Sequence, residues 1–186
     1  MINHVNVEFD TQEYITSNLN DFWKDTKFKG YKYLDPKQKG NLGEKWIANY
    51  LRKRGHNVEI PKFTKEVGNN GPYDLIIDGR NTEVKFGLSH TDNKKGFVKT
   101  DVFSINHVSF CKEWDYFLFI GINLNTPNRI AWMTKDDFGN ILKYTGRDYF
   151  TQQQAGKQHK NDDYFSMNKK PLKWIESKYS RRWEEW

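Results

Sequence analysis

Hydrophobic and polar residues alternate over two short neighbouring stretches of the chain, and this pattern predicts a β-hairpin. The first predicted strand covers residues 73–77 and the second covers residues 82–86. Between them lies Asp78-Gly79-Arg80-Asn81, a cluster that is typical of a hairpin turn. Leu75-Ile76-Ile77 in the first strand, with Val84 and Phe86 in the second, makes both strands apolar enough to be buried.

Apolar periodicity predicts further elements on both sides of this hairpin. Helical spacing predicts helices over residues 11–25, 41–54 (with Pro36 as an alternative start), 104–113 and 135–142, and a last helix opening at Pro171. Strand patterns cover residues 57–60, 115–122 and 129–133. Residues 87–100 read as a polar, basic loop and residues 144–170 as mostly irregular chain. A hairpin inside such a chain implies an α/β fold with a mixed sheet and helices on both faces.

Composition limits the class of protein. The 186 residues fit one domain, with a core over about residues 36–143 and extensions over residues 1–35 and 144–186. The net charge of +6 is compatible with nucleic acid as a partner. Cys111 is the only cysteine, so neither an internal disulfide nor a cysteine-rich zinc site can form. With no signal-peptide pattern and no run near the ~18 apolar residues of a membrane span, we expect a cytoplasmic protein without a membrane partner.

Two carboxylates and an amine fall on the predicted hairpin. Asp74 precedes the apolar run of the first strand, and Glu83 and Lys85 belong to the second. Alternation places Glu83 and Lys85 on one face of their strand, roughly 6.6 Å apart at the strand rise. Such a set at the rim of a buried sheet suits a metal ion and a phosphodiester.

Each of these residues also has an ordinary explanation. Asp74 can be a turn residue, and Glu83 and Lys85 can form a solvated strand face. The combination favours a site, because buried charges are costly unless they are paired or bound to metal. The interpretation requires Asp74, Glu83 and Lys85 to converge in space.

The segment Pro72-x-Asp74 with Glu83-x-Lys85, on a hairpin preceded by a helix, resembles the PD-(D/E)xK nucleases. This superfamily includes restriction endonucleases and Holliday junction resolvases, and the resemblance covers about residues 40–133. It implies a restriction-endonuclease-like core and a Mg²⁺-dependent endonuclease, with Mn²⁺ as a substitute, that cuts DNA and can act as a homodimer. Asp74 and Glu83 would be the metal ligands and Lys85 the catalytic amine. Lys85 is followed by Phe86-Gly87-Leu88, where some branches have glutamine.

Glu44 matches an additional glutamate that many members of this superfamily have on the helix before the hairpin. It lies four residues before Ala48 and seven before Leu51, on the inner stripe of its helix. A catalytic role is one reason for a carboxylate there. The other is a capping box with Asn41, which fails if the helix starts near Pro36.

Candidate nucleic-acid contacts lie outside the hairpin. They are Lys62, Lys65, Lys94, Lys95, Lys99, Gln158 and His159, all on predicted loops or irregular chain. Lysines on loops suit phosphates, although many such loops are simply solvated. Two other functions remain open from the sequence: a catalytically inactive DNA-binding module on the same scaffold, and an RNA- or protein-binding α/β domain in which the motif is accidental.

Overall fold

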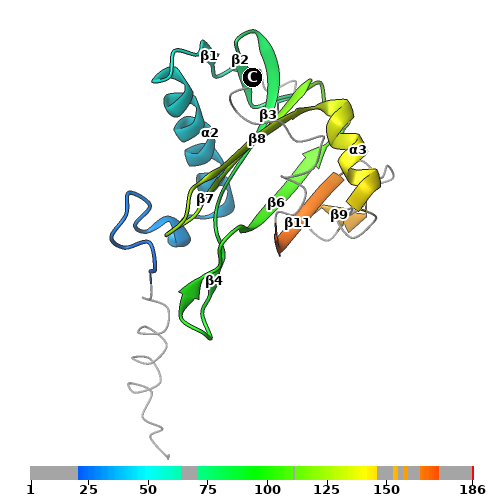
Figure 1. The fold of residues 1–186 in the computed structure, drawn as a ribbon. Coiled ribbons are helices and arrows are strands. Elements are labelled where there is room, and N and C mark those ends of the chain that lie inside the picture. Colours follow the sequence, from blue (N-terminus) through cyan, green and yellow to red (C-terminus); the bar gives the residue numbers. More distant parts are fainter. Residues whose placement is uncertain are drawn as a thin grey trace, which may run out of the picture.

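A computed structural model describes residues 21–63, 71–110 and 112–145, three short strands between residues 153 and 171, and residue 186. It confirms an α/β fold built on a mixed sheet (Figure 1). The five strands, in spatial order, are β1 (Val58–Glu59), β2 (Leu75–Ile77), β3 (Arg80–Leu88), β7 (Tyr116–Ile122) and β8 (Arg129–Thr134). Only the pair β3–β7 in this sheet is parallel, and β2–β3 is the predicted hairpin.

Helix α2 (Pro36–Arg52) begins at the earlier of the two predicted starts. Asp35 is its N-cap, with the Asp35 side chain accepting from the Gln38 N–H and the Gln38 side chain accepting from the Asp35 N–H. Pro36 at the first helical position suits this start. This start excludes the alternative in which Glu44 forms a capping box with Asn41, because both residues lie inside the helix.

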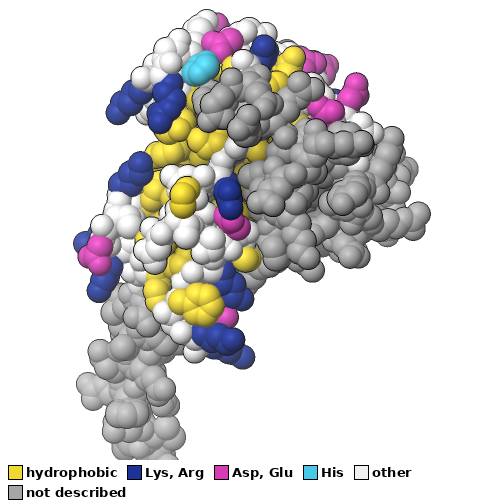
Figure 2. Space-filling model, viewed as in Figure 1, with side chains coloured by type: hydrophobic (Ala, Val, Ile, Leu, Met, Phe, Trp, Pro, Cys, Tyr) yellow, Lys and Arg dark blue, Asp and Glu magenta, His cyan; other side chains and the backbone are white. Residues whose placement is uncertain are grey.

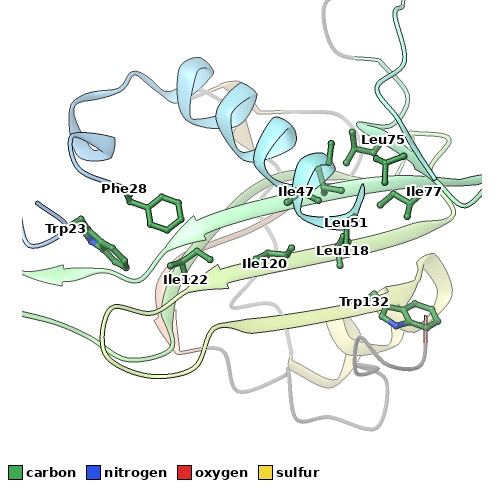
Figure 3. Packing of buried hydrophobic residues seen from close by; sticks show 13 residues of the cluster. Trp23, Phe28, Ile47, Leu51, Leu75, Ile77, Leu118, Ile120, Ile122 and Trp132 are labelled. Carbon is green, nitrogen blue, oxygen red and sulfur yellow. The ribbon is translucent and has the colours of Figure 1, made fainter. Parts of the chain in front are cut away.

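The sheet is covered on both faces, and strand β7 supplies side chains to both cores. Leu118 and Ile120 belong to the core under α2, where Ile47 and Leu51 point toward them (Figure 3). The other face carries a mostly aromatic cluster of Phe103, Ile105, Val108, Trp114, Phe117, Phe119, Met133 and Phe138. Both clusters are buried, so β7 is the central, two-sided strand that its apolar run predicts.

The predicted helix over residues 104–113 is wrong, because residues 102–109 form strand β6 (Val102–Ser109). Strand β6 pairs with β11 (Tyr164–Pro171), which lies in the region predicted to be irregular. The register of this pair shifts twice, so the apolar residues of β6 do not alternate strictly. Because of these shifts, the buried residues Ile105 and Val108 are three positions apart, a spacing that also fits a helix.

The connection between the parallel strands β3 and β7 is also made of strands. After β3 come β4 (Thr91–Asp92) and β5 (Phe97–Val98), which pair as a small hairpin, and then β6. Residues 87–100 are thus not one loop. The expected order of helix, strand, hairpin, helix and strand is interrupted here, because a strand replaces the second helix.

The other elements are short. They are the 3₁₀ turn η1 (Tyr31–Tyr33), helix α3 (Lys135–Thr145), β9 (Gln153–Gln154) and β10 (Lys157–Gln158). Of the predicted helix over residues 11–25, residues 11–20 lie outside the described chain and residues 21–25 form turns. Pro171 ends β11, and residues 172–185 of the predicted last helix lie outside the described chain. No helix in the described part of the chain is long and apolar enough to span a bilayer.

Candidate active site

The β2–β3 hairpin places Asp74 next to Glu83. Leu75 pairs with Thr82, so Asp74 stands one step further along, and its N–H donates to the Thr82 carbonyl at 3.1 Å. The connecting turn is Asp78-Gly79, with φ of 50° and 78°. Positive φ at both central residues is the mark of a type I′ turn, which matches the twist of the two strands and fixes their register.

At the edge of β3, the Asp74 carboxylate accepts a backbone hydrogen bond that a neighbouring strand would otherwise accept. The pairing of β2 with β3 ends at Leu75 and Thr82, and the next N–H on that side of β3, from Val84, donates to Asp74 Oδ2 at 3.0 Å. The half-buried Asp74 side chain is thereby held against β3. The motif aspartate is thus oriented by a hydrogen bond from the backbone of β3.

Glu83 is completely buried, and its two oxygens have different surroundings. Oε1 accepts a hydrogen bond from Lys85 Nζ at 2.6 Å, which confirms that Glu83 and Lys85 share a face of β3. Oε2 is buried without a hydrogen-bond partner among the described residues, and Lys112 Nζ lies 3.7 Å from it. Burial raises the pKa of Glu83, and the nearby lysines only partly offset this.

Lys85 lies between the two motif carboxylates, with Nζ 3.9 Å from Asp74 Oδ2 and 2.6 Å from Glu83 Oε1. Burial alone lowers the pKa of a lysine, but the negative charges of Glu83 and Asp74 outweigh it and raise the pKa of Lys85 above its ordinary value. The two carboxylates therefore favour the positively charged form of the amine. A protonated amine suits neutralising negative charge on a phosphate.

Glu44 joins this set from helix α2. The helix approaches β3 closely at Gly43, where an added Cβ would lie 2.7 Å from the Phe86 Cβ. Glu44 is half-buried; its burial and the negative charges of Asp74 and Glu83 raise its pKa to about 7, although Lys85 acts in the opposite direction. With the capping box excluded, the position of Glu44 near the other carboxylates is the remaining explanation for an acid on this stripe.

Lys112 is a member of the site that the sequence did not indicate. It lies in the connection from β6 to β7, and its carbonyl accepts a hydrogen bond from Lys135 Nζ at 2.6 Å. No local pattern around Lys112 distinguishes it from a surface lysine. The parallel pairing of Glu83 with Phe117 brings this connection to the site, and that pairing joins distant parts of the sequence.

The remaining candidates lie apart from this cluster or outside the described chain. Lys62 is exposed, and Lys94 and Lys95 are exposed on the β4–β5 turn, whereas Lys99 pairs with Asp92 at 3.3 Å. Lys65 and His159 lie outside the described residues, and Gln158 is in β10. Those candidates that lie among the described residues form no ion pair with Asp74 or Glu83.

The donor set of the site fits magnesium. Among the described residues, no three histidine, cysteine, aspartate or glutamate side chains form a group able to hold a metal ion by themselves. Mg²⁺ does not need such a cage, since it keeps several waters and is usually held by one or two carboxylates with substrate phosphate. Asp74 and Glu83 offer two carboxylates, and the buried, unbonded Glu83 Oε2 is a donor for a hard cation.

Comparisons with known proteins add little to this geometry. No protein-family model matches the sequence, and a search of curated proteins finds no significant match. A similar solved structure is that of a bacterial homing endonuclease, I-Ssp6803I, at 16% sequence identity and a TM-score of 0.38; the match covers 56% of this chain and 72% of that chain. Similarity at this level assigns neither a family nor an activity, so the function has to be argued from the site.

Proposed function

We propose that this protein has a restriction-endonuclease-like core and is a metal-dependent endonuclease that hydrolyses DNA phosphodiester bonds. The observation that carries the proposal is the convergence of Asp74, Glu83 and Lys85, with one oxygen of a fully buried glutamate left unbonded. An accidental motif on a solvated strand face would not bury Glu83.

Asp74 and Glu83 would hold Mg²⁺, or Mn²⁺ in its place. Bound there, the ion would lower the pKa of a coordinated water and polarise a phosphoryl oxygen. Lys85 keeps a positive charge beside both carboxylates and is placed to neutralise charge on the phosphate in the transition state. Lys112 adds a second cation on the far side of Glu83.

Glu44 is suited to an auxiliary role in proton transfer. Before a cation binds, burial and the charges of Asp74 and Glu83 hold the pKa of its carboxyl group at about 7, so this group can gain or lose a proton near neutral pH. An ordinary surface glutamate would be ionised at this pH and would offer no proton.

Cleavage assays on linear duplex, supercoiled, branched and single-stranded DNA test the proposal. The wild type is compared with Asp74→Asn, Glu83→Gln and Lys85→Met, in Mg²⁺, in Mn²⁺ and in EDTA. We expect metal-dependent cleavage by the wild type and a loss of about 10²-fold or more in each variant. Asp74→Asn and Glu83→Gln remove negative charge that would hold the metal ion, and Lys85→Met removes positive charge that would face the phosphate.

Glu59→Gln is the matched control, since it removes an exposed carboxylate from strand β1 of the same sheet. Melting temperatures show whether each variant is folded. Equal cleavage by the wild type and all three site variants would contradict the proposal. DNA binding without cleavage by the wild type would instead identify a catalytically inactive DNA-binding module.

A further inference from the structure

The β4–β5 hairpin is a separate ribbon at the end of strand β3. Thr91 pairs with Val98 and Asp92 with Phe97, and this pair forms a two-stranded sheet of its own. In Figure 1 the ribbon extends away from the five-stranded sheet and its covering helices. Its projection gives it a surface that the folded body leaves accessible.

The surface chemistry of this ribbon is cationic and apolar together. Lys94 and Lys95 are exposed on the turn, and Phe97 is 46% exposed, one of the few large hydrophobic side chains among the described residues with so much contact with solvent. Figure 2 shows dark-blue basic side chains beside hydrophobic surface over this part of the molecule. Lysines next to an exposed ring match the phosphates and the apolar groups of a DNA groove, such as the thymine methyl group.

Asp92 stabilises the turn of the hairpin through its side chain and its backbone. Asp92 Oδ1 accepts from the Lys95 N–H at 3.1 Å, the Asp92 carbonyl accepts from the Gly96 N–H at 2.8 Å, and Asp92 Oδ2 pairs with Lys99 at 3.3 Å. The hydrogen bond from the Lys95 N–H and the contact with Lys99 lower the pKa of the Asp92 carboxyl group. Asp92 and Lys99 therefore offset each other, and Lys94 and Lys95 are left as the outward charge of the turn.

The base of the hairpin is tied to the body. The Lys99 N–H donates to the His90 carbonyl, and the His90 N–H donates to the Val102 carbonyl, both at 2.8 Å. His90 Nε2 also lies 3.0 Å from Ser104 Oγ. A ribbon anchored in this way loses little conformational freedom when it binds.

Strand β3 links the hairpin to the candidate active site. From Lys85 the chain continues through Leu88 into β4, so Lys94 lies at most about 30 Å from Lys85 at the rise of a strand. At 3.4 Å per step, this upper limit corresponds to about nine base pairs of duplex DNA. A two-stranded ribbon has the width that the major groove of B-form DNA admits.

We propose that the β4–β5 hairpin is a DNA-binding arm that enters the major groove of duplex DNA, several base pairs from the bond that is cut. Lys94 and Lys95 contact phosphates, and Phe97 packs against the groove. The inference deepens the proposed endonuclease function and rests on it for the position of the cut. DNA binding through the hairpin is measured separately from cleavage.

Fluorescence anisotropy with a labelled 30-base-pair duplex, in EDTA and at salt between 50 and 200 mM, provides the test. For Lys94→Gln/Lys95→Gln we expect a Kd at least about 10-fold higher at 100 mM salt. The slope of log K against log salt should fall by about 2, because each lost phosphate contact removes about 0.9. For Phe97→Ser we expect a Kd about 5-fold higher or more with the slope unchanged, because this variant loses packing and no charge.

The control is Lys45→Gln/Lys53→Gln, which removes one exposed positive charge from helix α2 and one from its C-cap residue, eight residues apart. We expect its Kd to change less than about 2-fold. An equal loss in the control and in the hairpin variants would show dependence on net charge alone and would overturn the inference. Equally strong hairpin-dependent binding to duplex RNA would also overturn it, since the deep, narrow major groove of A-form RNA does not admit a ribbon.

Asp74→Asn separates the two proposals, because it should bind the duplex like the wild type without cutting it. If the wild type binds DNA through the hairpin but never cleaves it, the proposed endonuclease function is wrong and the proposal of a DNA-binding arm is supported. If the wild type cleaves while the hairpin variants bind as tightly as it does, the arm alone fails. A wild type that binds no duplex DNA overturns the arm.

Discussion

At the scale of single residues, Glu44 has the environment with the clearest thermodynamic consequence. Burial and the charges of Asp74 and Glu83 oppose its ionisation and raise its pKa from 4.5 to about 7. Between these values the folded protein binds more protons at Glu44 than the unfolded chain does. The contribution of Glu44 to stability therefore falls as the pH rises from 4.5 to 7, and the penalty is complete above pH 7.

Glu44→Gln should remove this penalty. The measured quantity is the unfolding free energy of the variant minus that of the wild type. We expect this difference to be about 1–2 kcal/mol higher at pH 8 than at pH 5. This range is smaller than the full pKa shift implies, because solvent screens a half-buried group. Urea denaturation in EDTA at the two pH values measures the gain, with Glu59→Gln as the exposed control. A difference between variant and wild type that does not change with pH would contradict the assignment.

The proximity of Asp74, Glu83 and Lys85 could be predicted because it depends on local rules. Strand alternation places Glu83 beside Lys85, and a short turn brings Asp74 opposite Glu83. Lys112 could not be predicted in this way. Its approach to Glu83 depends on the parallel pairing of β3 with β7, which joins residues more than thirty positions apart.

At the scale of elements, the close approach of α2 to β3 positions Glu44. Gly43 makes this approach possible, because any larger residue there meets the side chain of Phe86 at its Cβ, which cannot swing away. Gly40, one turn earlier in the same helix, has nothing within 4 Å of an added Cβ. The two glycines therefore provide a matched pair in one helix.

Gly43→Ala and Gly40→Ala should have opposite effects. We expect Gly43→Ala to destabilise the protein by about 1–3 kcal/mol through overpacking and to reduce cleavage by moving Glu44. Gly40→Ala should stabilise it by about 0.5–1 kcal/mol, as alanine favours the helix. Urea denaturation of both variants measures the contrast. Destabilisation of equal size at both positions would show that helix propensity or general disruption, not contact with Phe86, governs Gly43.

Strand β6 shows where prediction of elements from sequence failed. Helix α2, the β2–β3 hairpin, β7, β8 and α3 were found because their patterns repeat regularly within the element. In β6 the register shifts break the alternation, and the strand β11 that pairs with it follows more than fifty residues later. Local pattern could supply neither the bulges nor the partner.

At the scale of the whole molecule, Trp186 joins the last residue of the sequence to the central sheet. Its ring lies 5.2 Å from that of Trp132 and 5.7 Å from that of Tyr116, with the Arg80 guanidinium 4.9 Å from its centroid. Its Nε1–H donates to Asp78 Oδ2 at 3.1 Å. These contacts support the hairpin turn from a residue that is remote in sequence.

Trp186→Ala should lower the unfolding free energy by about 2–3 kcal/mol, below the full loss for a buried tryptophan because this ring is half-exposed. Trp186→Phe should cost about 1 kcal/mol, since it keeps a ring in place and loses the hydrogen bond to Asp78. Urea denaturation distinguishes the two variants. Values for Trp186→Ala within about 0.5 kcal/mol of the wild type would mean that the packing seen here contributes nothing.

The two-residue turn Asp78-Gly79 has a consequence for how this chain can vary. Side chains on a strand alternate between faces, so one residue inserted in or deleted from the turn would shift the pairing of β2 with β3 by one step. Asp74 would then stand opposite Thr82 or Val84, which alternation places on the opposite face of β3 from Glu83, and would no longer face Glu83. Every residue of the candidate site would still be present, yet the site would be gone. The length of this turn is therefore as much a requirement for the proposed chemistry as any of the charged groups.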